Sequence, residues 1–210
     1  DEWTKFSVKT KLNLNKIIDA IKFRSTHTNI MRPGLGVGGY CLTKDPDFIN
    51  FSGKYIFKKK FSFPITNISM KINKRMIFST IDFINEKIKN FKRKKILLLG
   101  AAYKDDVSDT RSSPSIFFSN FLKKNNINFL FHDPITNTND NKKYSISNKL
   151  PNFEKFDLVL FCVKHSYYKK MNAKKFSKKP TYFDLNRVLS YPQVNHMIKN
   201  KFKVEFLGGY

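Results

Sequence analysis

An α/β protein with a helical first part is predicted for this chain of 210 residues. Two observations predict it. Up to about residue 91, apolar side chains recur at the three- and four-residue spacing of amphipathic helices. From residue 94, short apolar runs alternate with helical segments, which is typical of a doubly wound parallel sheet of Rossmann type. We therefore expect a helical domain over residues 1–91 and an α/β domain over residues 92–210.

The first part is expected to contain two main helices. One covers about residues 11–23, and the other begins at Pro64 and keeps its helical period to about Phe91. The second helix exceeds the usual length in globular proteins, so we expect it to span between domains or to pack against a second subunit. The apolar face of the first helix consists of Leu14, Ile17, Ile18 and Ile21.

Five strands are expected in the second part, in the apolar runs KKILLLG, INFLFHDP, FDLVLFCV, TYFDL and FKVEFLG. Between the first two, Ser113 and Pro114 form an N-cap and first-turn pair for a helix that continues to about Lys124. Ligands of such sheets bind beyond the carboxyl ends of the strands. The loops expected to face a ligand follow Gly100, Phe131, Val163 and Phe183.

The loop after the first strand lacks the G-x-G-x-x-G turn of a dinucleotide site, because residues 100–104 read GAAYK. We therefore do not expect its backbone to approach a pyrophosphate closely. Cationic and hydroxyl side chains follow, and they suit a phosphate held by side chains and a helix N-terminus. A solvated loop before a capped helix is the alternative. The side chains in question are Lys104, Thr110, Arg111, Ser112 and Ser113.

The composition is strongly basic, with 40 Lys and Arg against 16 Asp and Glu and a formal net charge of +24. Such a charge attracts nucleic acid and other polyanions. Lysine is scattered along the chain with Asn, Ile and Phe, as expected of A- and T-rich codon usage, and no basic helix or RNA-binding motif accompanies it. We expect no specific nucleic-acid partner, and a polyanion-binding protein is kept as an alternative.

The sequence predicts a cytoplasmic protein without a membrane contact, because it has no apolar run of about 18 residues and no secretory leader pattern. Cys41 and Cys162 lie in unlike contexts far apart in the chain, which fits reduced thiols. No metal site is predicted. Because the first residue is Asp1 and not Met, a fragment is expected.

The segment RPGLGVGGYCLTKDP, residues 32–46, places a thiol on glycine-rich backbone close to an acid. Cys41 is a candidate nucleophile or a small buried apolar residue. Lys44 and a helix beginning at Pro46 would favour its thiolate form. Asp45, directly before Pro46, is also expected to cap that helix. Cys162, inside an apolar run, is expected to serve packing alone.

Three stretches together resemble one family, the UDP-glucose/GDP-mannose dehydrogenases. PGLGVGGYCLTKDP is similar to the catalytic cysteine loop of that family. LLLGAAYKDDVSDTRSSPS resembles the start of its UDP-binding domain, where an aromatic-Lys pair precedes D-x-R-x-S-P. FDLVLFCVKHSYYKK and FDLNRVL resemble later segments of the same domain. The resemblance implies a helical central domain that forms a homodimer through the long helix 64–91, followed by a UDP-binding domain.

The resemblance also implies an enzyme that oxidises the C6 alcohol of a UDP-sugar to the carboxylate in two NAD-dependent steps. Cys41 would form a thiohemiacetal and then a thioester, Asp45 would position the hydrolytic water, and Lys44 would assist. The NAD-binding domain of the family is absent from this sequence. The chain alone is therefore expected to be inactive and to bind no NAD at the normal site.

For the substrate, the resemblance implies that the glycines of the cysteine loop let the backbone run close to the sugar and its diphosphate. It implies that Tyr103 and Lys104 contact the UDP moiety. It also implies that Arg32 or Arg24 supplies a positive charge to the site of the other subunit in the dimer. Arg111 either binds ligand or pairs with Asp109. Further residues on the substrate list are Gly34, Gly36, Gly38, Gly39 and Arg187, while His165 is a ligand contact or a residue of a capped helix.

The identity of the sugar is left open between UDP-glucose, towards which CLTKD leans, UDP-N-acetylhexosamine and GDP-mannose. A non-catalytic nucleotide-sugar-binding or dimer-forming protein without the NAD domain is the alternative function.

Overall fold

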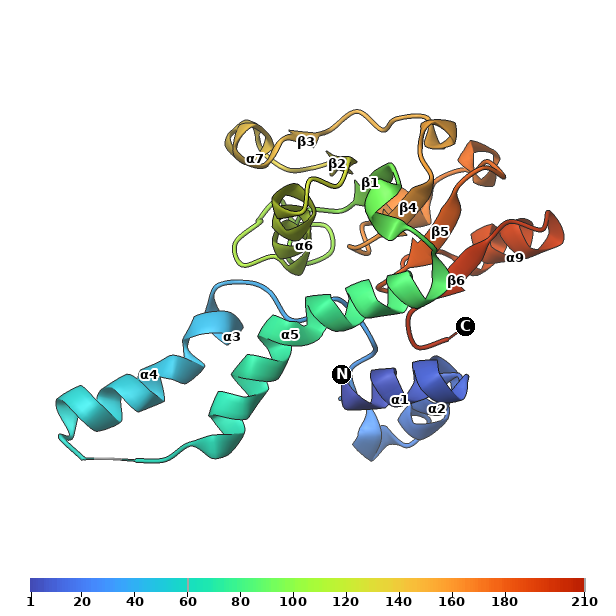
Figure 1. Ribbon diagram of the computed structural model, residues 1–210. Helices are drawn as coiled ribbons and strands as arrows, with labels where there is room; N and C mark the ends of the chain where they lie inside the picture. Colours follow the sequence, from blue (N-terminus) through green and yellow to red (C-terminus); the bar gives the residue numbers. More distant parts are fainter. Residues whose placement is uncertain (60, 210) are drawn as a thin grey trace.

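The computed structural model describes residues 1–59 and 61–209. Figure 1 shows a helical first part, a long helix α5 that runs from it, and an α/β part that follows. The helices of the first part are α1 (Glu2–Thr10), α2 (Leu14–Lys22), α3 (Cys41–Lys44), α4 (Pro46–Phe51) and α5 (Pro64–Lys87), with a π-helical segment over Ser52–Ile56.

The second part is built on a six-stranded parallel sheet in the order β3-β2-β1-β4-β5-β6. This order is that of a doubly wound Rossmann-type sheet, so the predicted fold class is confirmed. The strands are β1 (Ile96–Leu99), β2 (Phe129–His132), β3 (Ile146–Ser147), β4 (Leu158–Phe161), β5 (Thr181–Asp184) and β6 (Val204–Phe206). The helices are α6 (Pro114–Lys124), α7 (Thr138–Tyr144), α8 (Ser166–Lys169) and α9 (Tyr191–Lys199).

Several elements agree with the sequence prediction, and others, among them β3 and α1, were missed. The long helix begins at Pro64 as predicted, and α6 begins at Pro114 with the Ser113 hydroxyl accepting from the Ser115 amide at 3.2 Å. The prediction missed β3, because two residues are too short for an apolar run to stand out. It also missed α1, whose one buried residue is Ser7, so no apolar stripe marks it.

The core lies on both faces of the sheet, because alternate residues of the buried strands point to opposite sides. The second half of α5 covers one face, where Ile77, Ile81 and Ile84 are buried and Phe83 meets Phe183 edge to face at 5.9 Å. The second half of α5 therefore belongs to the helical layer that covers this face of the sheet.

The first half of α5 stands away from the sheet beside α4 (Figure 1). Ile65 is 79% exposed and Ile68 is 57% exposed, although both continue the apolar stripe of the helix. The segment Phe48–Phe57 opposite them exposes further large apolar side chains. We call this α4–α5 projection, residues 46–59 and 61–72, the arm. Its exposed apolar residues include Phe48, Ile49, Phe51, Tyr55, Ile56, Phe57, Phe61, Ile65 and Ile68.

The end of the chain returns to the helical part. The amide of Leu14 donates to the carbonyl of Gly208 at 2.8 Å, and the Asn15 side chain donates to the carbonyl of Gly209 at 2.7 Å. Gly208 has a φ of +80° and lies against Pro33, so a side chain there would be strained. The first turn of α2 is thereby joined to the segment after β6. Over the residues that the structure describes, no helix has the length and apolar character needed to cross a membrane.

Candidate functional site

Cys41 begins α3 and is exposed at the end of the glycine-rich segment. The Thr43 hydroxyl donates to the Gly39 carbonyl at 2.6 Å, which closes the turn that contains the thiol. The Gly39 amide donates to the carbonyl of Arg111 at 3.1 Å. The cysteine loop is therefore attached to the loop that precedes α6 in the α/β part.

Two glycines allow this contact. A Cβ at Gly38 would lie 2.8 Å from the Ser112 carbonyl oxygen and 2.8 Å from the Cβ of Tyr103. Gly39 has a φ of +87°, and a Cβ there would lie 2.8 Å from the ring of Tyr103. Tyr103 thus packs on the backbone of the cysteine loop. The structure adds a reason for glycine at these positions besides the predicted approach to a sugar.

At the other two glycines of the substrate list, which are half-buried, a side chain would also approach protein atoms. A Cβ at Gly34 would meet the Asn186 side chain at 2.8 Å, and Gly36, with a φ of +127°, faces Asn73. Their assignment to substrate binding stays a prediction.

Asp45 does not cap the helix that begins at Pro46, so this expectation was wrong. Its side chain makes no capping hydrogen bond, because the backbone at Asp45 is itself helical and α3 runs directly into α4. The carboxylate is left exposed at 48% and lies 3.8 Å from the Lys44 ammonium. Lys44 also lies over the Tyr40 ring, 3.7 Å from its centroid. The Lys44 ammonium and the Asp45 carboxylate therefore follow Cys41 closely in the chain, and both are accessible.

Arg111 is paired with Asp109 in the same loop. Its guanidinium donates twice to Asp109 Oδ2, from Nε at 2.9 Å and from the terminal nitrogen at 2.6 Å. The hydrogen bonds from Arg111 hold the pKa of Asp109 below its usual range. The guanidinium is still 65% exposed and lies 5.3 Å from the Tyr40 ring centroid. The structural alternative for Arg111 is thus observed, and an exposed cation remains beside the cysteine loop.

Arg32 and Arg187 are brought together by Asp19 of α2. Arg32 donates to one carboxylate oxygen of Asp19, and Arg187 donates to the other at 3.3 Å. The hydrogen bond from Arg32 is the main cause that lowers the pKa of Asp19. Sequence reasoning missed Asp19, because one acid on a helix carries no motif.

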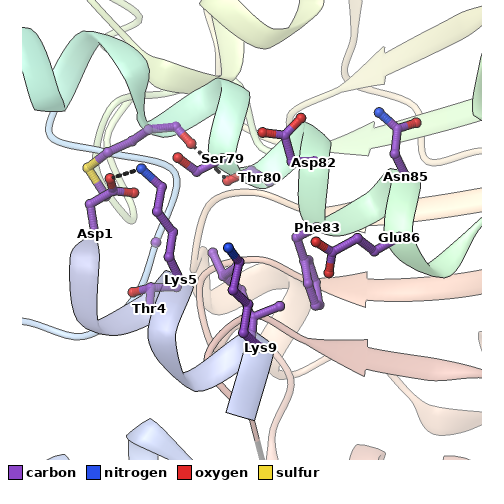
Figure 2. A pocket seen from close by; sticks show the side chains of 14 residues that line it. Asp1, Thr4, Lys5, Lys9, Ser79, Thr80, Asp82, Phe83, Asn85 and Glu86 are labelled. Atoms are coloured by element: carbon purple, nitrogen blue, oxygen red, sulfur yellow. Dashed lines mark hydrogen bonds and ion pairs between the residues drawn. The ribbon is translucent and has the colours of Figure 1, made fainter. Parts of the chain in front are cut away.

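The cavities do not by themselves locate the site. One cavity of about 620 Å³ lies between α1 and α5 and is lined by charged side chains of both helices, with Lys5 bonded to Asp1 (Figure 2). Cys41 does not line it. A cavity of about 380 Å³ adjoins the cysteine loop at Val37 and Thr43 and the start of α6 at Ser112 and Pro114. The side chains with reactive groups, not the volumes, therefore define the candidate site.

Two residues of the α/β part that were considered from the sequence are buried. Cys162 is 2% exposed, and burial raises the pKa of its thiol to about 12, which disfavours the thiolate form. His165 is fully buried at the N-cap position of α8, where its side chain makes no capping hydrogen bond and is bonded instead to Asp133 at 3.0 Å. Burial also lowers the pKa of neighbouring His132 to about 4, which keeps its ring neutral near pH 7. Within residues 1–59 and 61–209, no group of three His, Cys, Asp or Glu could hold a metal ion.

Comparison with known families agrees with this geometry. The model for the central domain of the UDP-glucose/GDP-mannose dehydrogenase family matches residues 1–75, and the model for the UDP binding domain of the same family matches residues 97–191. The chain belongs to this family. The two matches cover the cysteine loop and the Tyr103–Lys104 loop, respectively, which the structure places in contact.

Individual relatives are similar over almost the whole chain. A UDP-N-acetyl-D-mannosamine dehydrogenase of Methanococcus vannielii is 29% identical over 200 residues, which are 90% of this chain and 44% of the relative. The structure of a UDP-D-ManNAc dehydrogenase from Pyrococcus horikoshii aligns with a TM-score of 0.69 and 25% identity over 99% of this chain and 47% of that one. An NDP-N-acetyl-D-galactosaminuronic acid dehydrogenase of Methanosarcina mazei shares the fold, with a TM-score of 0.70 and 21% identity over 98% of this chain and 50% of that one. This chain spans about half the length of these relatives.

Proposed function

We propose that this chain is the substrate-binding and thiol-bearing half of a nucleotide-sugar 6-dehydrogenase. One observation carries the proposal: the Gly39 amide bonds to the Arg111 carbonyl, and Tyr103 packs on Gly38 and Gly39. This contact sets an exposed thiol beside the loop that matches the nucleotide-binding loop of the family. A UDP held by Tyr103 and Lys104 would then leave its sugar close to Cys41.

The residues of this chain supply the second half of the reaction. The thiolate of Cys41 adds to the C6 aldehyde of the sugar, forming a C–S bond and a thiohemiacetal. After oxidation to the thioester, water attacks the acyl carbon, the C–S bond breaks, and the thiol takes up a proton. Asp45, whose carboxylate is exposed and makes no capping hydrogen bond, would orient that water in this proposal. Lys44 is the nearby cation.

NAD is the hydride acceptor in this proposal, one molecule for each oxidation. The residues present do not fit it, because the turn after β1 reads GAAYK and lacks the second and third glycines of a dinucleotide site. NAD therefore belongs to a domain outside this chain, and the chain alone is proposed to be inactive. Among the sugars, we favour an N-acetylated hexosamine over glucose, because two relatives named for UDP-N-acetyl-D-mannosamine align with 90% and 94% of this chain.

UDP binding by the chain tests the nucleotide assignment. We expect Lys104→Ala to weaken UDP binding about tenfold, since it removes a charge-assisted contact worth about 1.4 kcal/mol. Isothermal titration calorimetry measures the change. Lys123→Ala, at the far end of α6, removes the same charge and is expected to leave the Kd unchanged. Equal weakening by both variants, together with a steep fall in affinity with salt, would favour the polyanion alternative.

The proposed homodimer would form through the arm. The arm exposes large apolar side chains on both α4 and α5, and exposed apolar side chains that gather on one part of a protein are typical of an interaction surface. We expect Ile65→Lys combined with Ile68→Lys to convert a dimer to a monomer, because two charges would be buried in the interface. Sedimentation velocity measures the mass. Ile198→Lys on α9, where Ile198 is 53% exposed, is the control and should stay dimeric. A wild-type monomer would refute the dimer.

A further inference from the structure

The loop from Ala101 to Asp106 carries Tyr103 and Lys104 and has no regular secondary structure. Its conformation is held by two fully buried side chains from other loops, Asp133 after β2 and His165 before α8. Neither residue has a role in the chemistry described above. The hydrogen bonds that they make hold the backbone at both ends of this irregular loop.

Asp133 holds the start of the loop. Its Oδ2 accepts from the amide of Ala101 at 2.7 Å and from the amide of Ala102 at 3.2 Å. Its Oδ1 accepts from the amides of Ile135 at 3.0 Å and Thr136 at 3.1 Å. Burial alone would raise the pKa of Asp133, but the hydrogen bonds from His165 and these amides outweigh it, so the pKa is lowered. Asp133 is therefore an ionised acceptor at neutral pH.

His165 holds the end of the loop. The amide of Asp106 donates to Nδ1 of His165 at 2.9 Å, so Nδ1 carries no proton. The proton is then assigned to Nε2, which donates to Asp133 Oδ2 at 3.0 Å. The Asp106 carboxylate accepts in turn from the amide and the hydroxyl of Ser166, at 2.8 Å and 2.6 Å. One connected network thus fixes both ends of the six-residue loop.

We propose that Asp133 and His165 are positioning residues that pre-organise the Tyr103–Lys104 loop for the nucleotide. This inference rests on the proposed function. A loop that is already ordered loses less conformational entropy on binding, so part of the affinity would come from two residues that never touch the ligand. Since Tyr103 also packs on Gly38 and Gly39, the same network would fix the nucleotide contact relative to the thiol loop.

Two substitutions of His165 separate the halves of the network. In His165→Asn, the side-chain oxygen can replace Nδ1 as acceptor for the Asp106 amide, but nothing replaces the donor to Asp133. In His165→Gln, the side-chain nitrogen can replace Nε2 as donor to Asp133, while the Asp106 amide loses its acceptor. Asp133→Asn keeps the shape but removes the charge that holds the Ala101 amide. Each variant is expected to weaken UDP binding by the full chain about tenfold, with a smaller loss for whichever histidine variant restores more of the network.

A loss of stability alone must be separated from a loss of positioning. Tyr182→Phe removes a buried hydroxyl that bonds to the Ser177 backbone near the opposite, amino end of the sheet. It should lower the melting temperature as the network variants do, yet leave the Kd for UDP unchanged. Titrations below every melting temperature, with hydrogen exchange at the amides of Ala101, Ala102 and Asp106, give the two readouts. The proposal predicts weaker binding and faster local exchange in the network variants.

The outcomes distinguish this inference from the function on which it rests. If wild-type chain binds UDP and Lys104→Ala weakens binding, but the network variants keep the wild-type Kd, the positioning role is wrong and the nucleotide site stands. If Tyr182→Phe weakens binding as much as they do, the effect is one of general stability and the positioning role is equally refuted. If the wild-type chain binds no UDP, both are refuted.

Discussion

Replacing Cys41 with alanine is expected to abolish formation of the uronate by the proposed complete enzyme, in which this chain acts together with a separate NAD-binding domain. Without the thiol, no covalent intermediate forms and the second oxidation has no path, so the rate of acid production should fall by about 1,000-fold or more. UDP binding should be unchanged, because the side chain is exposed and makes no packing contribution to the core. Chromatographic detection of the UDP-uronate, next to a UDP titration, measures both.

The second cysteine provides the matched control for that experiment. Cys162→Ala removes a thiol from the buried core of β4 and its loop, so it should lower the melting temperature and leave the rate per folded enzyme unchanged. Uronate production at the wild-type rate by the Cys41 variant would remove Cys41 from the mechanism.

A single methyl group at Gly38 is expected to destabilise the protein by about 1–3 kcal/mol and to impair UDP binding as well. The added Cβ would stand 2.8 Å from the Ser112 carbonyl and 2.9 Å from the Pro114 ring, so the cysteine loop must move away from Tyr103. Urea unfolding of Gly38→Ala measures the free energy, and titration with UDP measures the affinity.

The neighbouring residue tests whether this effect comes from the close approach. Val37→Ala lies in the same loop at a half-exposed position, so it should change the free energy of unfolding by less than about 0.5 kcal/mol. If Gly38→Ala changed the free energy of unfolding as little, the loop would not depend on its contact with Tyr103. The contact between the two loops would then no longer support the proposed function.

The sheet could be predicted because its central strands have a clear sequence pattern. Residues 96–99 and 158–161 are continuous apolar runs and are fully buried, as expected of parallel strands covered on both faces. The long helix was equally clear from its period and from Pro64. In contrast, β3 forms because His132 and Phe131 of β2 offer an unpaired edge, which no local pattern in residues 146–147 records.

The reactive residues of the candidate site could be predicted from the sequence, but the contacts that hold them in position could not. The motifs around Cys41 and Lys104 stand in the sequence, whereas the contact between their loops joins residues more than 60 positions apart. Asp45 was misjudged as a cap, because the sequence Asp-Pro does not reveal that the preceding turn is already helical. The role of Asp133 could not be predicted for a similar reason. Its carboxylate oxygens accept hydrogen bonds from backbone amides, and such bonds leave no motif in the sequence.

The burial of α5 on the sheet has a consequence for how the protein can be divided. A cut near residue 91, between the two predicted domains, would leave Ile77, Ile81 and Ile84 on one fragment and the sheet face that they cover on the other. The same cut would part Leu14 from Gly208. An expression fragment of the α/β part is therefore expected to be soluble only if it begins upstream, at the buried half of the long helix, and crystallisation or screening trials should carry that segment.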